Sequence, residues 1–249
     1  MIKRLVKGLL ARQGFELVNA AARDAQAIAD LSPADRAIVQ RVAPFTMTGL
    51  DRRAALINAI DHVVRAGIPG AIVECGVWRG GSMMTAALAL KDRGQTDREL
   101  WLYDTFEGMS EPTEADRSHD GVSAQLQLER TARGTGVWCE ASLEDVMTNL
   151  RSTGYPWERI RFQRGKVEDT IPAALPGPIA LLRLDTDWYE STRHELQHLY
   201  PLLQPGGVLI IDDYGHWQGA RRAVDEYFAG RPVYLHRVDY TARLMVKPA

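Results

Sequence analysis

The feature that most constrains the fold is an alternation of short apolar runs with longer segments of helical periodicity. The apolar runs are AIVEC, ELWLYD, RIRFQRG, IALLRLD and GVLIIDD, at residues 71–75, 99–104, 159–165, 179–185 and 207–213. Runs of this length are typical of strands that are buried on both faces. Helical patterns occupy residues 82–92, 142–152, 191–203 and 219–228. The alternation predicts βαβ units, and therefore an α/β fold with a mostly parallel, twisted sheet and helices on both faces.

The two ends of the chain differ from this central block. Apolar residues at helical spacing, interleaved with Lys and Arg, predict a basic amphipathic helix over residues 2–10. Such a helix packs on its own domain, on a second subunit or on a membrane surface. Residues 20–41 are also helical in pattern, with a break where Ser32 can cap and Pro33 can start the next helix. Near the C-terminus, runs at 233–238 and 243–246 predict an antiparallel strand pair.

We therefore expect residues 1–50 to form a helical extension or lid and residues 51–249 to form the main domain.

Composition then excludes several classes of function. The 249 residues carry 30 Lys and Arg against 32 Asp and Glu, a formal net charge of −2, which leaves no basic excess for binding nucleic acid. Cys75 and Cys139 are the two cysteines, too few for a disulfide framework. No membrane-spanning run or signal-peptide pattern is present, so we expect a cytoplasmic protein.

Candidate ligand-binding residues follow the first strand, because ligands of doubly wound sheets bind beyond the carboxyl ends of the strands. Glu74 lies at this strand end, and a glycine-rich turn leads from Gly76 to Ser82, which we expect to cap the next helix. The turn lacks the GKS/T ending of a P-loop. Val77 and Trp78 also depart from a GxGxxG pattern. These bulky residues do not favour a closely packed pyrophosphate.

An acidic residue follows the second strand, 28 residues after Gly76. This residue, Asp104, is placed to accept hydrogen bonds from both hydroxyls of a ribose, as in dinucleotide-binding folds. A ribose without a pyrophosphate signature favours S-adenosylmethionine over NAD as the ligand. Glu74 would then lie near the cationic methionine end of that cofactor.

Four further carboxylates follow the fourth and fifth strands. Asp185 and Asp187 end one run, and Asp212 and Asp213 end the other. On neighbouring strands these groups meet at one sheet edge, where like charges about 4 Å apart repel by several kcal/mol at a moderate dielectric. Mg²⁺ prefers oxygen ligands of this kind. The sequence therefore predicts a divalent cation site, with solvated strand-end acids as the alternative.

Five segments together resemble the macrocin O-methyltransferase family, the magnesium-dependent sugar O-methyltransferases of macrolide and aminocoumarin pathways. The segments are TMTGLDRR (46–53), GAIVECGVWRGGS (70–82), YDTFEGM (103–109), RLDTDWYEST (183–192) and LQPGGVLIIDDY (203–214). The resemblance implies a Rossmann-like class I methyltransferase fold and a homo-oligomer. It also implies methyl transfer from S-adenosylmethionine to a hydroxyl, of a sugar on a natural product or glycolipid, with a divalent metal that orients and acidifies this hydroxyl.

The resemblance also implies roles for individual residues. Cofactor contacts are expected from Thr46, Met47, Glu74, Gly76, Trp78, Ser82, Asp104, Phe106, Glu168 and Asp185, and metal contacts from Asp185, Asp212 and Asp213. For Trp78, Phe106 and Glu168 the alternative is a structural role in packing or in a turn. The general base is open, because Trp188 occupies the position where catechol-type enzymes carry a lysine. Asp185, Asp187 and His216 are the candidates.

Three alternatives to sugar O-methylation follow from the sequence: another acceptor, another enzyme class and a non-catalytic binding protein. A catechol or another phenol is the alternative acceptor. An NAD-dependent oxidoreductase on the same type of sheet is disfavoured by the missing GxGxxG pattern, and a non-catalytic binding protein by intact carboxylates at all three metal positions. Acceptor contacts are expected from the N-terminal helices and from residues 110–137, which include the polar loop at 110–121, a candidate lid.

Overall fold

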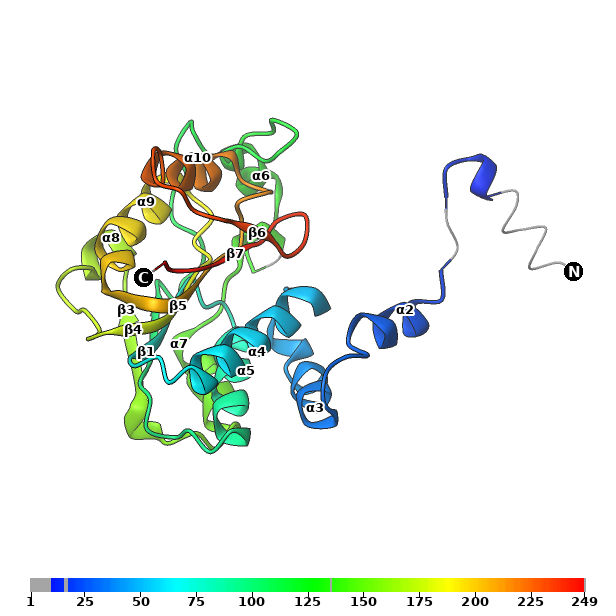
Figure 1. Ribbon diagram of the computed structural model, residues 1–249. Helices are drawn as coiled ribbons and strands as arrows, with labels where there is room; N and C mark the ends of the chain where they lie inside the picture. The colour runs from blue at the N-terminus through cyan, green and yellow to red at the C-terminus, as the bar shows by residue number, and fades with distance from the viewer. Residues whose placement is uncertain (1–9, 16–17, 135, 249) are drawn as a thin grey trace, which may run out of the picture.

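The computed structural model describes residues 10–15, 18–134 and 136–248. Within them, a seven-stranded sheet has the order β3-β2-β1-β4-β5-β7-β6 (Figure 1). The strands are β1 (Ala71–Cys75), β2 (Leu100–Asp104), β3 (Ile160–Arg164), β4 (Ile179–Leu184), β5 (Leu203–Ile211), β6 (His236–Arg237) and β7 (Arg243–Val246). Strands β1 to β5 are parallel, and β7 pairs antiparallel with β5 and β6. The predicted α/β fold and the terminal antiparallel pair are confirmed.

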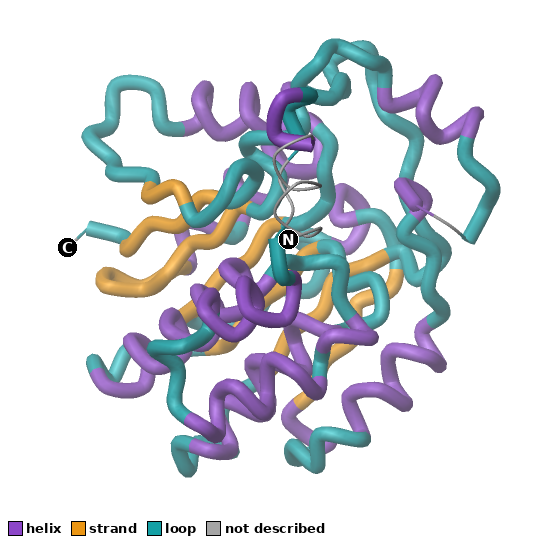
Figure 2. The backbone as a smooth tube through the Cα atoms, turned by 90° about the vertical axis from the view of Figure 1, so that its right-hand side faces the viewer, coloured by secondary structure: helices purple, strands orange, loops and turns teal. Residues whose placement is uncertain are grey.

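Helices cover both faces of the sheet, as Figure 2 shows. On one face lie α3 (Pro33–Arg41), α4 (Leu50–Arg65), α5 (Gly81–Asp92) and α7 (Leu143–Arg151). On the other lie α8 (Val167–Thr170), α9 (Tyr189–His198) and α10 (Gln218–Tyr227). The remaining described elements are α2 (Ala20–Ala27), α6 (Ala124–Arg130), and the short 3₁₀ helices η1 (Ala43–Phe45), η2 (Gly136–Trp138), η3 (Trp157–Arg159) and η4 (Tyr200–Leu202). Because both faces are covered, β1 and β4 are buried at every residue.

The helix starts agree with the sequence in one place and differ in another. Ser32 caps α3 by accepting a hydrogen bond from the Asp35 amide, and Pro33 opens the helix, as predicted. The prediction that Ser82 caps α5 is wrong, because α5 begins at Gly81 and its N-cap residue is Gly80, with φ +84°. Only glycine adopts this left-handed conformation without strain, so the chain turns before the serine, which lies inside the first helical turn.

The N-terminal segment lies outside the sheet. Helix α2 projects beside α4, away from the strands (Figure 1), whereas α3 places Ile38, Val39 and Val42 in the core shared with α4 and α5. The basic helix expected over residues 2–10 falls almost entirely outside the described residues. Among the residues that the structure does describe, no helix combines the length and apolar character needed to span a membrane.

Candidate active site

A cleft opens at the carboxyl ends of the parallel strands, with about 1070 Å³ of space when the open solvent at its mouth is included. The strand order reverses between β1 and β4, which is where α/β sheets of this type bind ligands. Eight of the ten residues expected to bind the cofactor line it: Thr46, Met47, Gly76, Trp78, Ser82, Asp104, Glu168 and Asp185. The other two, Glu74 and Phe106, are buried behind its wall.

Gly76 lines the cleft where the turn after β1 meets the end of β4. Its φ is +80°, and a Cβ atom on this residue would lie 2.0 Å from the carbonyl oxygen of Asp185. The Asp185 amide in turn donates a hydrogen bond of 2.8 Å to the Cys75 carbonyl. Because the side chain at position 76 is only a hydrogen atom, the turn after β1 approaches the end of β4 closely. This contact places Asp185 directly beside the glycine-rich turn.

Asp104, at the end of β2, holds the same turn from the other side. Its Oδ2 accepts hydrogen bonds from the Val77 and Trp78 amides at 2.5 and 3.2 Å, and its Oδ1 accepts one from the Phe106 amide at 2.7 Å. Burial raises the pKa of Asp104, and these backbone donors oppose the rise. In this structure Asp104 therefore fixes the turn, and its contact with a ribose stays a prediction.

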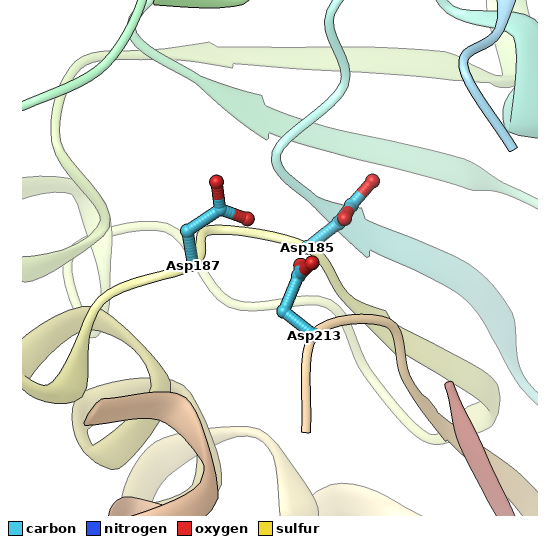
Figure 3. Close-up of side chains that lie close together, drawn as sticks. All are labelled: Asp185, Asp187 and Asp213. Carbon is cyan, nitrogen blue, oxygen red and sulfur yellow. The ribbon is translucent and has the colours of Figure 1, made fainter. Parts of the chain in front are cut away.

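Three carboxylates converge at the neighbouring strand ends. One ligand-type oxygen from each of Asp185, Asp187 and Asp213 lies within 4.8 Å of the others, and Figure 3 shows the side chains rising on the same side from the ends of β4 and β5. Burial raises the pKa of Asp187 to about 7. Burial, with the charges of neighbouring carboxylates, also raises the pKa of Asp185 and Asp213 well above the usual range. The three carboxylates repel one another when they are ionised, and a proton or a cation bound between them relieves this repulsion.

A buried arginine lies beneath this group and was missed in the sequence. Arg183, 4% exposed, places Nη1 2.6 Å from both Glu74 Oε1 and Asp185 Oδ2, and Nη2 2.7 Å from Asp212 Oδ1. The register of β1 and β4 sets Glu74 directly opposite Arg183. Burial raises the pKa of Glu74 to about 7, although Arg183 opposes the rise. An arginine inside the apolar run IALLRLD was the available signal, because charged residues are rarely buried without partners.

Asp212, an expected metal ligand, lies in ion pairs instead of in the three-carboxylate group. It is 3% exposed and pairs with both Arg183 and Arg52. Arg52 Nε also lies 3.0 Å from Asp239 Oδ2. The expected metal set and the observed group therefore share Asp185 and Asp213. Arg52, which the sequence reasoning also missed, belongs to the TMTGLDRR segment.

The three candidate bases have different surroundings. Asp187 lines the cleft within the acidic group, and Asp185 is paired with Arg183. His216 lines a neighbouring cavity together with His119. Its Nδ1 lies 3.2 Å from the Tyr240 hydroxyl, and burial and His119 lower its pKa. Asp187 is thus the candidate that lies in the cleft and pairs with none of the arginines that the structure describes.

Trp188 and the polar loop expected to form a lid contact each other. The Trp188 indole donates a hydrogen bond of 3.0 Å to the Ser110 carbonyl, and its ring packs edge-on against Trp217. Within the loop, the buried Asp116 accepts a hydrogen bond of 2.8 Å from the Tyr189 amide at the start of α9. Trp188 therefore anchors the loop, which is tied to the helix that follows the acidic strand end.

Comparison with known proteins agrees with this architecture. Residues 10–246 match the family model of macrocin O-methyltransferases (TylF). The chain is 42% identical over 182 residues to the 8-demethyl-8-(2,3-dimethoxy-alpha-L-rhamnosyl)-tetracenomycin-C 4'-O-methyltransferase of Streptomyces olivaceus, covering 73% of this chain and 67% of that protein. It is 37% identical over 182 residues to the mycinamicin III 3''-O-methyltransferase of Micromonospora griseorubida, covering 73% and 69%.

Solved structures give the same result. The O-methyltransferase NovP superposes with a TM-score of 0.72 at 32% identity, covering 82% of this chain and 83% of that chain. The calicheamicin methyltransferase CalS11, at 20% identity and a TM-score of 0.58, covers 86% and 93% and shares the fold. The chain therefore belongs to the macrocin O-methyltransferase family and is an O-methyltransferase with a class I methyltransferase fold.

Proposed function

We propose that the enzyme transfers the methyl group of S-adenosylmethionine to a sugar hydroxyl of a glycosylated natural product, at a site that also binds Mg²⁺. The observation that carries this proposal is the convergence of Asp185, Asp187 and Asp213 at the side of the cleft. The sugar acceptor is supported by relatives named for methylation of a rhamnosyl group and of mycinamicin III.

The methyl donor would occupy the part of the cleft between the glycine-rich turn and α8. Gly76 and Ser82 would border its methionine part, Asp104 would bind the ribose, and Glu168 would accept a hydrogen bond from the adenine amine. Trp78 offers an aromatic face beside these residues. Thr46 and Met47 lie at the same cleft and precede α4, so we place this end of the N-terminal extension next to the donor.

The residues fit a divalent cation by charge and by unmet hydrogen bonding. Oδ2 of Asp213 is buried and has no hydrogen-bond donor among the described residues. The carboxylates at this site outnumber the arginines by four, and the groups concerned are Glu74, Asp185, Asp187, Asp212, Asp213 and Asp239 against Arg52 and Arg183. A divalent cation and the sulfonium of the donor would offset part of this excess. Mg²⁺ prefers such oxygen ligands.

Asp185 and Asp213 belong to both the expected and the observed carboxylate sets, so we propose them as metal ligands, with Asp212 as the third. A bound divalent cation would lower the pKa of the acceptor hydroxyl. Asp187 would then serve as the general base that takes the hydroxyl proton, because its carboxylate lies in the cleft beside Asp185 and Asp213 and pairs with no arginine among the described residues. Methyl transfer is an in-line displacement, so the cleft walls contribute by aligning donor and acceptor.

Mass spectrometry of acceptor panels tests this function. The purified enzyme is incubated with S-adenosylmethionine and with matched pairs of a glycoside and its aglycone, in the presence of Mg²⁺ or of a chelator. We expect a single added methyl group on the glycoside, lost with the chelator and absent from the aglycone. Equal methylation of simple catechols, or full activity with the chelator, would contradict the proposal. Oligomerisation and a cytoplasmic location stay predictions.

A further inference from the structure

Asp212 is held by two arginines that differ in how firmly they are fixed. Arg183 is 5% exposed in its side chain and contacts carboxylates at the ends of three strands. Removing it from Asp212 would leave charges buried without compensation. Arg52 is 19% exposed, lines the cleft and has a second carboxylate partner in Asp239. Arg52 is therefore the arginine that can leave Asp212 at low cost.

Asp239 is a fixed anchor for Arg52. Its Oδ1 accepts hydrogen bonds from the Thr241 and Ala242 amides at 2.9 and 2.8 Å, which leaves Oδ2 to pair with Arg52 at 3.0 Å. This turn connects β6 to β7 at the edge of the sheet. An Arg52 side chain that released Asp212 would still be held in an ion pair at the cleft.

We propose that Arg52 is an exchangeable counter-ion that holds Asp212 in the metal-free enzyme and yields this carboxylate to the divalent cation. The inference rests on the metal site of the proposed function. It explains why an expected metal ligand is paired with arginines and is not a member of the group formed by Asp185, Asp187 and Asp213. The exchange keeps Asp212 next to a positive charge in both states, which a buried carboxylate requires. Arg52 and the cation therefore compete for one ligand.

Calorimetric titration of Mn²⁺ into chelator-treated enzyme, without methyl donor, tests the competition. We expect R52Q to bind the ion about tenfold more tightly than wild type, a typical size for coupling between two binding events. R53Q is the matched control, since Arg53 has the same charge on the same helix but donates to the Val39 carbonyl at 2.6 Å. R53Q should bind Mn²⁺ as wild type does. Unchanged or weaker binding in R52Q would overturn the inference.

A double-mutant cycle separates direct competition from a general charge effect. A D212N background keeps Asp185 and Asp213 as ligands, so Mn²⁺ should bind more weakly than to wild type, and R52Q should no longer change this weaker affinity because the shared carboxylate is gone. A tightening that persists in D212N would mean that Arg52 acts through its field on the whole acidic group, and would overturn the inference.

R52K provides a second variant should R52Q fold poorly. Lysine keeps the charge but cannot span Asp212 and Asp239 as the guanidinium does, so its affinity for Mn²⁺ should lie between those of wild type and R52Q. Weaker binding than wild type would contradict the competition. If wild type itself binds no Mn²⁺, the metal site of the proposed function is wrong. If wild type binds Mn²⁺ but R52Q binds it no more tightly, only the competition between Arg52 and the cation is wrong.

Discussion

Glu74 and Arg183 face each other across β1 and β4, with Oε1 of the carboxylate 2.6 Å from Nη1 of the guanidinium. Both side chains are nearly inaccessible to solvent. The same guanidinium contacts Asp185 and Asp212. The pair therefore links the strand that leads into the glycine-rich turn to the two strands that carry the acidic group.

Replacing this arginine should be strongly destabilising. R183M leaves buried carboxylates without their cation, and we expect the free energy of unfolding to fall by about 3–5 kcal/mol. Urea denaturation measures the change. R222M is the control, because Arg222 is exposed and pairs with Glu226 on the surface of α10, and such pairs contribute about 0–1 kcal/mol. Similar losses of stability in R183M and R222M would show that the buried ion pairs contribute no more than a surface ion pair.

The close approach at Gly76 can be separated from its backbone conformation. G76A places a methyl group against the Asp185 carbonyl, whereas G94A has a similar positive φ but nothing within 4 Å of the added atom. Conformational strain is common to both, so G76A should lose about 1–3 kcal/mol more than G94A through overpacking. It should also weaken binding of S-adenosylhomocysteine. Equal stability of the two variants would argue against the tight contact.

The acidic group predicts an unusual pH dependence for the metal-free enzyme. The pKa of Asp187 is raised to about 7, so the folded state holds this proton more tightly than the unfolded chain does. Its contribution to stability is full in acid and is lost as the pH rises through about 7. A cation replaces the proton, and we expect the thermal shift produced by Mg²⁺ to grow from about pH 5 to about pH 8. A shift that is constant or larger in acid would contradict this prediction.

The sequence predicted the sheet well because the central strands β1, β2 and β4 are short and mostly apolar runs, whereas β3, with the sequence IRFQR, is only partly buried. The exception is β5, which begins at Leu203, four residues before the predicted start. Pro205 and Gly206 disguise this part of the strand, since both are depleted in strands. The strand also ends at Ile211, so Asp212 and Asp213 lie just past it.

The acidic site was predictable in part. Carboxylates at the ends of adjacent parallel strands must meet, and Asp185, Asp187 and Asp213 do. The orientation of Asp212 was not predictable, because its partner Arg52 is 160 residues away in the chain. The hydrogen bonds of Asp104 depend on the path of the turn at Trp78, where φ is +44°. Tertiary contacts and turn geometry of this kind leave little trace in a single sequence.

The assignment of the general base can be tested by two substitutions. D187N keeps the size of the side chain but cannot accept the proton, and we expect kcat to fall about 10²–10⁴-fold. H216N should keep most of the activity, because His216 lines a separate cavity. Binding of S-adenosylhomocysteine, measured in parallel, should be similar in both variants. A large loss of kcat in H216N with little loss in D187N would reverse the assignment.

The central claim, that the acidic group binds one divalent cation, is tested most directly by metal stoichiometry. Equilibrium dialysis of chelator-treated enzyme against Mn²⁺ should give one ion per chain for wild type and for D225N, whose exposed carboxylate lies on α10. D213N should lose this ion, because Asp213 belongs to both the expected and the observed carboxylate sets. Equal Mn²⁺ binding by D213N and wild type, or none by wild type, would contradict the claim.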